Sequence, residues 1–338
     1  MELNIIWFIL ISVLFIGYFI LEGFDMGVGI LLPFLGKTDL KRRVMINTIG
    51  PHWDGNEVWL ITAGGAIFAA FPNWYATLFS GFYLPLFLML LALIARGVAF
   101  EFRGKIENPR WKSTWDACLF LGSLIPALLW GVAFANFLKG IPIDQKMTYT
   151  GGFFNLLNYY ALIAGVLAIL VFTLQGSLFL AMKTDGDIRK EAHRVASRLW
   201  IPVLVVLVGF VAVTFLAPNI LNKESLIPNP AALISILAVI LVGIFTLRAK
   251  DGLAFIFSSL AILAGMAGFF IELFPRVLVS STDPTYSLTI YNASSSPYTL
   301  QVMTVIAAIF VPVVLAYQIW TYVVFRNRIS EKKESLHY

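Results

Sequence analysis

Two carboxylic acids interrupt an apolar stretch near the start of the chain, in the sequence LEGFDMGVG. Glu22 and Asp25 are three residues apart and would therefore project from one face of a helix. Gly23 and Gly27 form a G-x-x-x-G strip, which lets a second helix approach closely. An ionisable group at the centre of a bilayer costs about 2.5 to 3.5 kcal/mol, so the two acids are predicted to form a proton or quinone site. The alternative is a protonated, hydrogen-bonded packing pair.

More polar side chains begin the next apolar stretch, in the sequence PHWDGNEVWL. They are His52, Trp53, Asp54, Asn56 and Glu57. An acid at a helix N-terminus gains roughly 0.3 to 1 kcal/mol from the helix dipole, and this explains Asp54 alone. It does not explain why the five side chains occur together. We therefore expect Asp54 and Glu57 to be functional, with His52, Trp53 and Asn56 as a supporting motif.

A third stretch, LLALIARGVAFEFRGK, carries Arg96 about two turns before the end of its helix and Glu101 at that end. An arginine inside a membrane span needs a carboxylate partner. Arg96 needs such a partner more than any other residue of the sequence.

The elements that must position these side chains are membrane helices. The chain has 338 residues, of which 59% are apolar and only 13% charged, more hydrophobic surface than a water-soluble fold of this length can cover. We predict an all-α, polytopic membrane protein with about nine transmembrane helices, as two four-helix bundles plus one peripheral helix, in a single transmembrane domain over 1–338. The apolar runs, each near the roughly 20 residues that a span needs, are 5–33, 54–72, 76–102, 115–138, 153–182, 199–217, 231–248, 252–274 and 299–325.

Basic residues fall on alternate connections between these runs. One set of connections holds only Lys139, Lys146, Lys223 and Arg276, whereas the other is rich in Lys and Arg, including Lys332 and Lys333. Positive loops mark the cytoplasmic side, so the N-terminus is predicted outside and the C-terminus in the cytoplasm. Because the net charge of +5 comes from these short loops and not from a basic patch, we expect no nucleic-acid partner.

With this orientation, one cytoplasmic half-channel would be lined by Asp25, Asp54, Glu57, Arg96 and Glu101. Protons move only between groups within hydrogen-bond reach, so acids, an arginine and inserted water are what a proton relay requires. A buried ion-pair network that serves folding alone is the alternative.

The sequence gives no sign of a metal or haem site. Cys118 is the only cysteine, which excludes an intrachain disulfide, an iron–sulfur cluster and a thiolate zinc site. The three histidines are His52 near a membrane edge, His193 in a basic connection and His337 in the tail. No two of them are placed to ligate a haem between two helices.

Four stretches together resemble subunit II of the cytochrome bd-type quinol oxidases: LEGFDMGVG, KRRVMINTIGPHWDGNEVWLITAGGAIFAAFP, SGFYLPLF with RGVAFEFRGK, and STDPTYSLTIYNASSSPYTLQVMT. The likeness runs nearly end to end, and PHWDGNEVWL is its most specific part. The resemblance implies a heterodimer in the bacterial cytoplasmic (inner) membrane, in which subunit I carries two haems b, haem d and the quinol-oxidising loop. The present chain would be its non-haem partner, in contact with membrane lipid, quinol and a small single-helix accessory subunit.

The resemblance also implies roles for particular residues. In the family a water-filled proton pathway enters from the cytoplasm along the subunit boundary, and the matching positions here are Asp54, Arg96 and Glu101. Asp25 matches the carboxylate of the family's GFDMG motif, and some members hold a quinone near the first helix, which makes Glu22 and Asp25 candidate quinone ligands. Glu22 and Glu101 stand where some relatives are expected to have Asp, which keeps the charge and lengthens the reach by one methylene.

The favoured interpretation is therefore a subunit that supports the haem-bearing subunit I and lines a proton-uptake path to the site of dioxygen reduction, with no catalytic residue of its own. Intramembrane carboxylates and short loops alone would also suit a proton-coupled secondary transporter. A third interpretation is a scaffolding subunit that only covers subunit I.

Overall fold

The computed structural model describes residues 2–216, 228–330 and 336. Four residues of the predicted loops and tail, Lys223, Lys332, Lys333 and His337, lie outside these residues.

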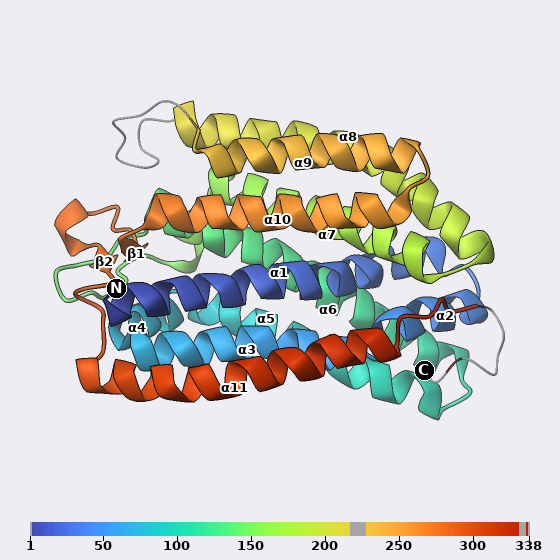
Figure 1. The fold of residues 1–338 in the computed structure, drawn as a ribbon, viewed down its shortest axis with the longest axis horizontal. Coiled ribbons are helices and arrows are strands. Elements are labelled where there is room, and N and C mark those ends of the chain that lie inside the picture. The colour runs from blue at the N-terminus through green and yellow to red at the C-terminus, as the bar shows by residue number, and fades with distance from the viewer. Residues whose placement is uncertain (1, 217–227, 331–335, 337–338) are drawn as a thin grey trace.

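Long helices make up most of the described chain (Figure 1). The α-helices are α1 (Leu3–Leu35), α2 (Asp39–Ile49), α3 (Trp53–Ala70), α4 (Pro72–Gly81), α5 (Tyr83–Phe102), α6 (Pro109–Lys139), α7 (Tyr159–Lys183), α8 (Gly186–Leu216), α9 (Pro230–Leu247), α10 (Asp251–Leu273) and α11 (Pro297–Val324). Single turns of 3₁₀ helix are η1 (Arg103–Lys105), η2 (Phe153–Leu156) and η3 (Pro284–Tyr286), and a two-stranded sheet pairs β1 (Arg276–Leu278) with β2 (Leu288–Thr289).

Local capping signals explain where several helices begin. Asn108, Asn229 and Ser296 accept hydrogen bonds from backbone N–H groups in the first turns of α6, α9 and α11. Each of these caps is followed by a proline, whose missing N–H would have had no partner at that position. The breaks between long apolar runs are thus encoded locally.

Within the described residues, eight helices are long and apolar enough to cross a membrane. They correspond to eight of the predicted runs and confirm the all-α, polytopic class. The remaining run corresponds to α3, which is 18 residues long and could span about 27 Å. Asp54, Asn56 and Glu57 lower its apolar character, and it is not among the eight. The total of nine spans and the orientation in the membrane stay predictions.

The helices pack in two groups (Figure 1). In one group α1 packs on α3 and α6, and α6 on α5; in the other α7 packs on α8 and α10, and α9 on both α8 and α10. Two helices join the groups: α1 contacts α7 and α10, and α6 packs on α7. Helix α11 runs along α3 at the edge of the first group, and Leu300 is its one buried residue. The division into two four-helix bundles and one peripheral helix stays a prediction.

Helices α1 and α7 approach each other closely where they cross. A Cβ added to Gly27 would lie 1.9 Å from the carbonyl oxygen of Phe172, and one added to Gly176 would lie 2.4 Å from the carbonyl carbon of Gly27. A Cβ on Gly23 would meet the side chains of Gln175 and Phe172 at 2.7 and 2.8 Å. The close helix contact predicted for the G-x-x-x-G strip is therefore confirmed.

The two ends of the helix bundle are built differently. At the end that holds α2, Arg103 donates to Asp116 (Nε–Oδ1, 2.6 Å) and to Asp39 (Nη2–Oδ1, 2.8 Å). Partial burial would raise the pKa of Asp39, but hydrogen bonds from Arg103 and Lys112 outweigh it and lower that pKa. At the opposite end, β1 and β2 lie beside the N-terminus (Figure 1), where Asn4 donates to the carbonyl of Ile290.

Replacing Gly27 by alanine should destabilise the protein, because the new methyl group would force α1 and α7 apart. Overpacking of this kind costs typically about 1 to 3 kcal/mol. The measurement is the Tm of the purified protein in detergent. Gly209→Ala is the matched control, since Gly209 is exposed on α8 with nothing within 4 Å of an added Cβ. Equal Tm values for the two variants would show that the crossing is not tightly packed.

Candidate functional site

Arg96 of α5 lies at the centre of a buried ionic cluster. Its side chain is fully buried, and Nη1 donates hydrogen bonds to Glu22 of α1 and to Glu57 of α3, the second at 2.8 Å. The guanidinium also lies over the ring of Phe100, 5.6 Å from its centroid. One cation therefore holds together acids from the other two helices, as expected for an arginine inside a span.

Asp25 lies about one turn further along α1 and is also fully buried. Its Oδ2 accepts a hydrogen bond of 2.7 Å from Nδ2 of Asn56, which is buried too. The spacing of three between Glu22 and Asp25 thus places both acids toward the beginning of α3. The structure brings together four predicted site residues and Asn56 of the supporting motif: Glu22, Asp25, Glu57, Arg96 and Asn56.

The charges in this cluster do not balance. Three carboxylic acids share one guanidinium, and Glu22 and Asp25 have no exposed surface. Burying an unpaired carboxylate costs several kcal/mol, so the cluster is more stable when it retains protons than when every acid is ionised. The cluster therefore holds more acidic groups than its one cation can neutralise.

Several atoms of the cluster have unused hydrogen-bonding capacity. Within the described residues, Oε2 of Glu22, Oδ1 of Asp25, and Nε and Nη2 of Arg96 are buried and have no hydrogen-bond partner. Buried polar atoms in native proteins are nearly always paired. These four atoms therefore call for a further polar partner.

Asp54 and Glu101 lie apart from the buried cluster. Both side chains are exposed, and neither has a described hydrogen bond or ion pair. Asp54 is one turn before Glu57 on α3, and Glu101 lies near the end of α5, five residues beyond Arg96. The structure does not join these two acids to the cluster directly, and their part in a pathway stays a prediction.

His52 and Trp53 position the first turn of α3. The ring of His52 stacks on Tyr322 of α11, with centroids 4.4 Å apart, and Trp53 stacks on Phe100 of α5 at 4.9 Å. His52 is 3% exposed, and its burial, aided by the charge of Lys183, lowers its pKa to about 4. His52 is therefore neutral at physiological pH.

Three residues of the site were not predicted: Trp59 on α3, and Gln318 and Tyr322 on α11. Gln318 and Tyr322 both donate to Oδ1 of Asn56, at 3.2 and 2.9 Å, and Trp59 donates to Gln318 at 2.8 Å. A signal was present, because Gln318 and Tyr322 are polar and four apart in the last apolar run, and so share one helix face.

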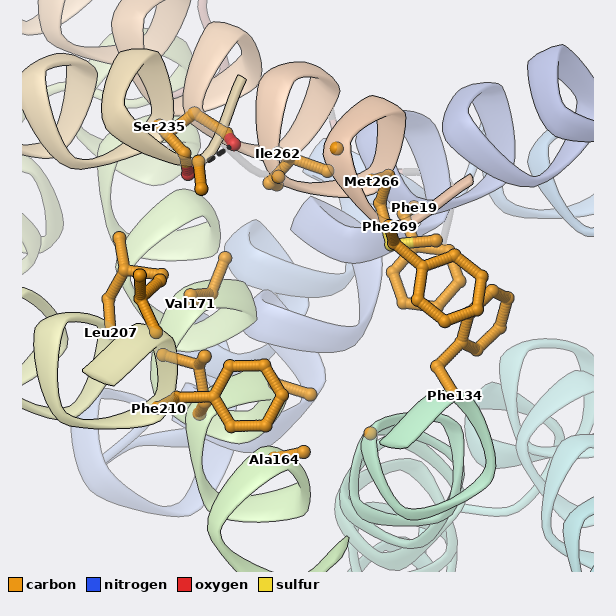
Figure 2. Close-up of a pocket in the computed structure, with 18 of the residues that line it drawn as sticks. Phe19, Phe134, Ala164, Val171, Leu207, Phe210, Ser235, Ile262, Met266 and Phe269 are labelled. Atoms are coloured by element: carbon orange, nitrogen blue, oxygen red, sulfur yellow. Dashed lines mark hydrogen bonds between the residues drawn. The ribbon is translucent and has the colours of Figure 1, made fainter. Parts of the chain in front are cut away.

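A separate apolar cavity of about 210 Å³ lies between the two helix groups. Figure 2 shows Phe19, Phe134 and Phe269 on one side of it, and Val171, Leu207 and Phe210 on the other. Ser235 stands at its edge and donates a hydrogen bond to the carbonyl of Ala261. Glu22 and Asp25 do not line this cavity, although Phe19 is on the same helix.

Comparison with known proteins gives consistent results. The family model described as cytochrome bd terminal oxidase subunit II matches residues 3–325. The cytochrome bd ubiquinol oxidase subunit 2 of Bacillus subtilis (strain 168) is 44% identical over 332 residues, which cover 98% of each chain. The cytochrome bd-I ubiquinol oxidase subunit 2 of Escherichia coli (strain K12) is 42% identical, over 98% of this chain and 96% of that one. A chain in the structure of bd oxidase from Geobacillus thermodenitrificans has the same fold, with a TM-score of 0.77 at 16% identity, over 97% of this chain and all of that one.

Replacing Arg96 by glutamine should lower stability strongly. Breaking a buried ion pair by removing one partner costs about 3 to 5 kcal/mol, because the remaining charges are uncompensated. The Tm of the purified protein measures this loss, and the double variant Arg96→Gln/Glu22→Gln should recover part of it. An unchanged Tm in the single variant would mean that Arg96 does not hold the three helices together.

His52 should make stability depend on pH. Its pKa is about 4 in the folded protein and about 6.5 when unfolded, so its contribution is fully present above pH 6.5 and is lost as the pH falls toward 4. At pH 5.5 the loss should be about 1 kcal/mol. The Tm of the native protein should therefore fall more between pH 7.5 and 5.5 than the Tm of His52→Phe, which keeps the stacking on Tyr322. Parallel curves for the two proteins would contradict the assignment.

Proposed function

The chain belongs to the cytochrome bd terminal oxidase subunit II family, and from that premise we propose that its buried acid cluster supplies protons from the cytoplasm to the site of dioxygen reduction. As a member of this family it is a multi-pass protein of the bacterial cytoplasmic membrane and one subunit of a quinol oxidase, with subunit I as its partner. Reduction of dioxygen to water consumes protons, so a proton-conducting path to the reaction site is a chemical necessity for the complex.

The observation that carries the proposal is the excess of buried acid over buried base. Glu22, Asp25 and Glu57 surround Arg96 within one cluster. A network that served folding alone would be most stable with equal numbers of acids and cations, since each uncompensated charge is costly. Extra acids that can be neutral or ionised are what proton transfer needs. Arg96 limits the cost of the ionised state by compensating one negative charge.

The exposed acids complete the proposed path at the cytoplasmic side. Asp54 and Glu101 would collect protons at the surface, and Glu57, one turn from Asp54 on α3, would pass them inward. Glu57 suits this position because its side chain is 18% exposed, whereas those of Glu22 and Arg96 are fully buried. Glu22 and Asp25 would then hold the proton in the interior.

The haems and the quinol site belong to the partner in this proposal. Two haems b and haem d, carried by subunit I, would supply the electron transfer and the dioxygen chemistry. The described histidines of the present chain do not fit a haem, because His52 is stacked on Tyr322 and Nδ1 of His193 lies 2.7 Å from Oδ1 of Asp251. The quinone role predicted for Glu22 and Asp25 has less support than proton transfer, since both acids are fully buried and neither lines the cavity of Figure 2.

Asp54→Asn and Asp25→Asn should each abolish most of the turnover while the complex still assembles. Proton transfer by a positioned group contributes typically 10²- to 10⁴-fold to a rate, so we expect a loss of at least about tenfold. The measurement is quinol-driven oxygen consumption per haem in the purified complex, with the haem content taken from the visible spectrum.

Glu107→Gln is the matched control, because Glu107 is an exposed acid in the connection between α5 and α6 and pairs with Lys112. Its turnover per haem should equal that of the native complex. Full haem content with normal turnover in both Asn variants would favour the scaffolding function. Substrate uptake by this chain alone would favour a transporter.

A further inference from the structure

A directional chain of hydrogen bonds ends on Asp25. It begins at Nε1 of Trp59, which donates to Oε1 of Gln318 at 2.8 Å. Nε2 of Gln318 donates to Oδ1 of Asn56 at 3.2 Å, and Nδ2 of Asn56 donates to Oδ2 of Asp25 at 2.7 Å. This series of hydrogen bonds crosses from α3 to α11, returns to α3 and ends on α1.

The direction of this chain follows from the chemistry of its first member. An indole N–H can only donate, so the atom of Gln318 that faces Trp59 must be its oxygen. The amide nitrogen of Gln318 then faces Asn56, and the atom of Asn56 that meets it must also be an oxygen. By the same logic the nitrogen of Asn56 faces Asp25. Trp59 thus determines the orientation of two amides, each of which could otherwise turn over.

Asn56 has all its hydrogen-bonding positions filled. Its Oδ1 accepts from Gln318 and, at 2.9 Å, from the hydroxyl of Tyr322, while Nδ2 donates to Asp25 and, at 3.3 Å, to the carbonyl of Leu21. Turning the amide would place a donor against the donor N–H of Gln318 and a carbonyl against the carboxyl group of Asp25. Such buried, fully satisfied networks are rigid.

We propose that Trp59, Gln318 and Tyr322 are positioning residues, which orient Asn56 so that Asp25 exchanges its proton only through Oδ1. Oδ2 already accepts a hydrogen bond from Asn56, whereas Oδ1 is buried without a partner in the described part of the chain. Amide groups do not release protons readily, so the α11 side of Asp25 is a support and not a second path. The inference rests on the proposed proton relay.

The titratable and charged groups around Asp25 come from four helices. They are Glu22 on α1, Glu57 on α3, Arg96 on α5 and Tyr322 on α11. Without the donors from α11, Asn56 is no longer held in place and its hydrogen bond to Oδ2 weakens, which stabilises the ionised form of Asp25 less and leaves the other interactions in place. The decline of turnover at alkaline pH should therefore move to higher pH.

The test is the double variant Gln318→Met/Tyr322→Phe, which removes both donors to Oδ1 of Asn56 and keeps the ring that stacks on His52. Turnover per haem is measured against pH in the purified complex. We expect a full haem content, a several-fold lower maximum, and an alkaline decline displaced upward by about one pH unit. The single variant Trp59→Phe should move the decline in the same direction.

The matched control is Gln301→Met/Tyr298→Phe on the same helix, since both residues are exposed and have no described hydrogen bond. Its pH profile should equal that of the native complex. A native profile in both Gln318→Met/Tyr322→Phe and Trp59→Phe would overturn the inference.

Infrared difference spectra give a readout that does not depend on turnover. The carbonyl band of protonated Asp25 is assigned by its loss in Asp25→Asn. It should shift to higher frequency in the α11 double variant, because Asn56 is no longer held in place and its hydrogen bond to the carbonyl oxygen weakens; an unshifted band would contradict the inference. Normal turnover in Asp25→Asn would instead overturn the proton relay itself, so the two failures are distinguishable.

Discussion

The arrangement of α1, α3 and α5 depends on the burial of one guanidinium among three carboxylic acids. Arg96 cannot be buried without acceptors, and Glu22 and Glu57 cannot both be buried as anions without Arg96. Each helix therefore supplies a side chain that would be unstable in lipid if the other two were absent. The same requirement underlies the chemistry proposed for the site, because three buried acids cannot all be ionised at low cost beside one cation.

The sequence predicted those parts of the site that are set within one helix. The spacing of Glu22 and Asp25 predicted a common face, and the glycine strip predicted a close helix contact, since both follow from helical periodicity alone. The need of Arg96 for carboxylates followed from the cost of an unpaired charge in a membrane. These features are confirmed by the ion pairs around Arg96 and by the crossing of α1 and α7.

The contribution of α11 could not be predicted in the same way. Gln318 lies 262 residues from Asn56 along the chain, and no local pattern states which helix will cover which face. The separation of Asp54 from the buried acids has a similar origin. Spacing places Asp54 and Glu57 near one face of α3, but the position of Arg96 along α5 decides that only Glu57 is within reach. Polar residues in its first turns also keep α3 out of the eight helices that are long and apolar enough to cross a membrane, so the feature that gives α3 its proposed chemistry weakens its signal as a membrane span.

The crossing at Gly27 has an evolutionary consequence. Each residue of a helix turns the chain by about 100°, and only a few residues of α1 separate Asp25 from the glycine that touches α7. Inserting or deleting one residue between them would rotate either the acids away from Arg96 or the glycine away from its partner helix. Point substitutions at neighbouring lipid-facing positions do not change the angle about the helix axis between Asp25 and Gly27. Changes in length should therefore accumulate in the connections between helices, while this segment of α1 keeps a constant number of residues during divergence.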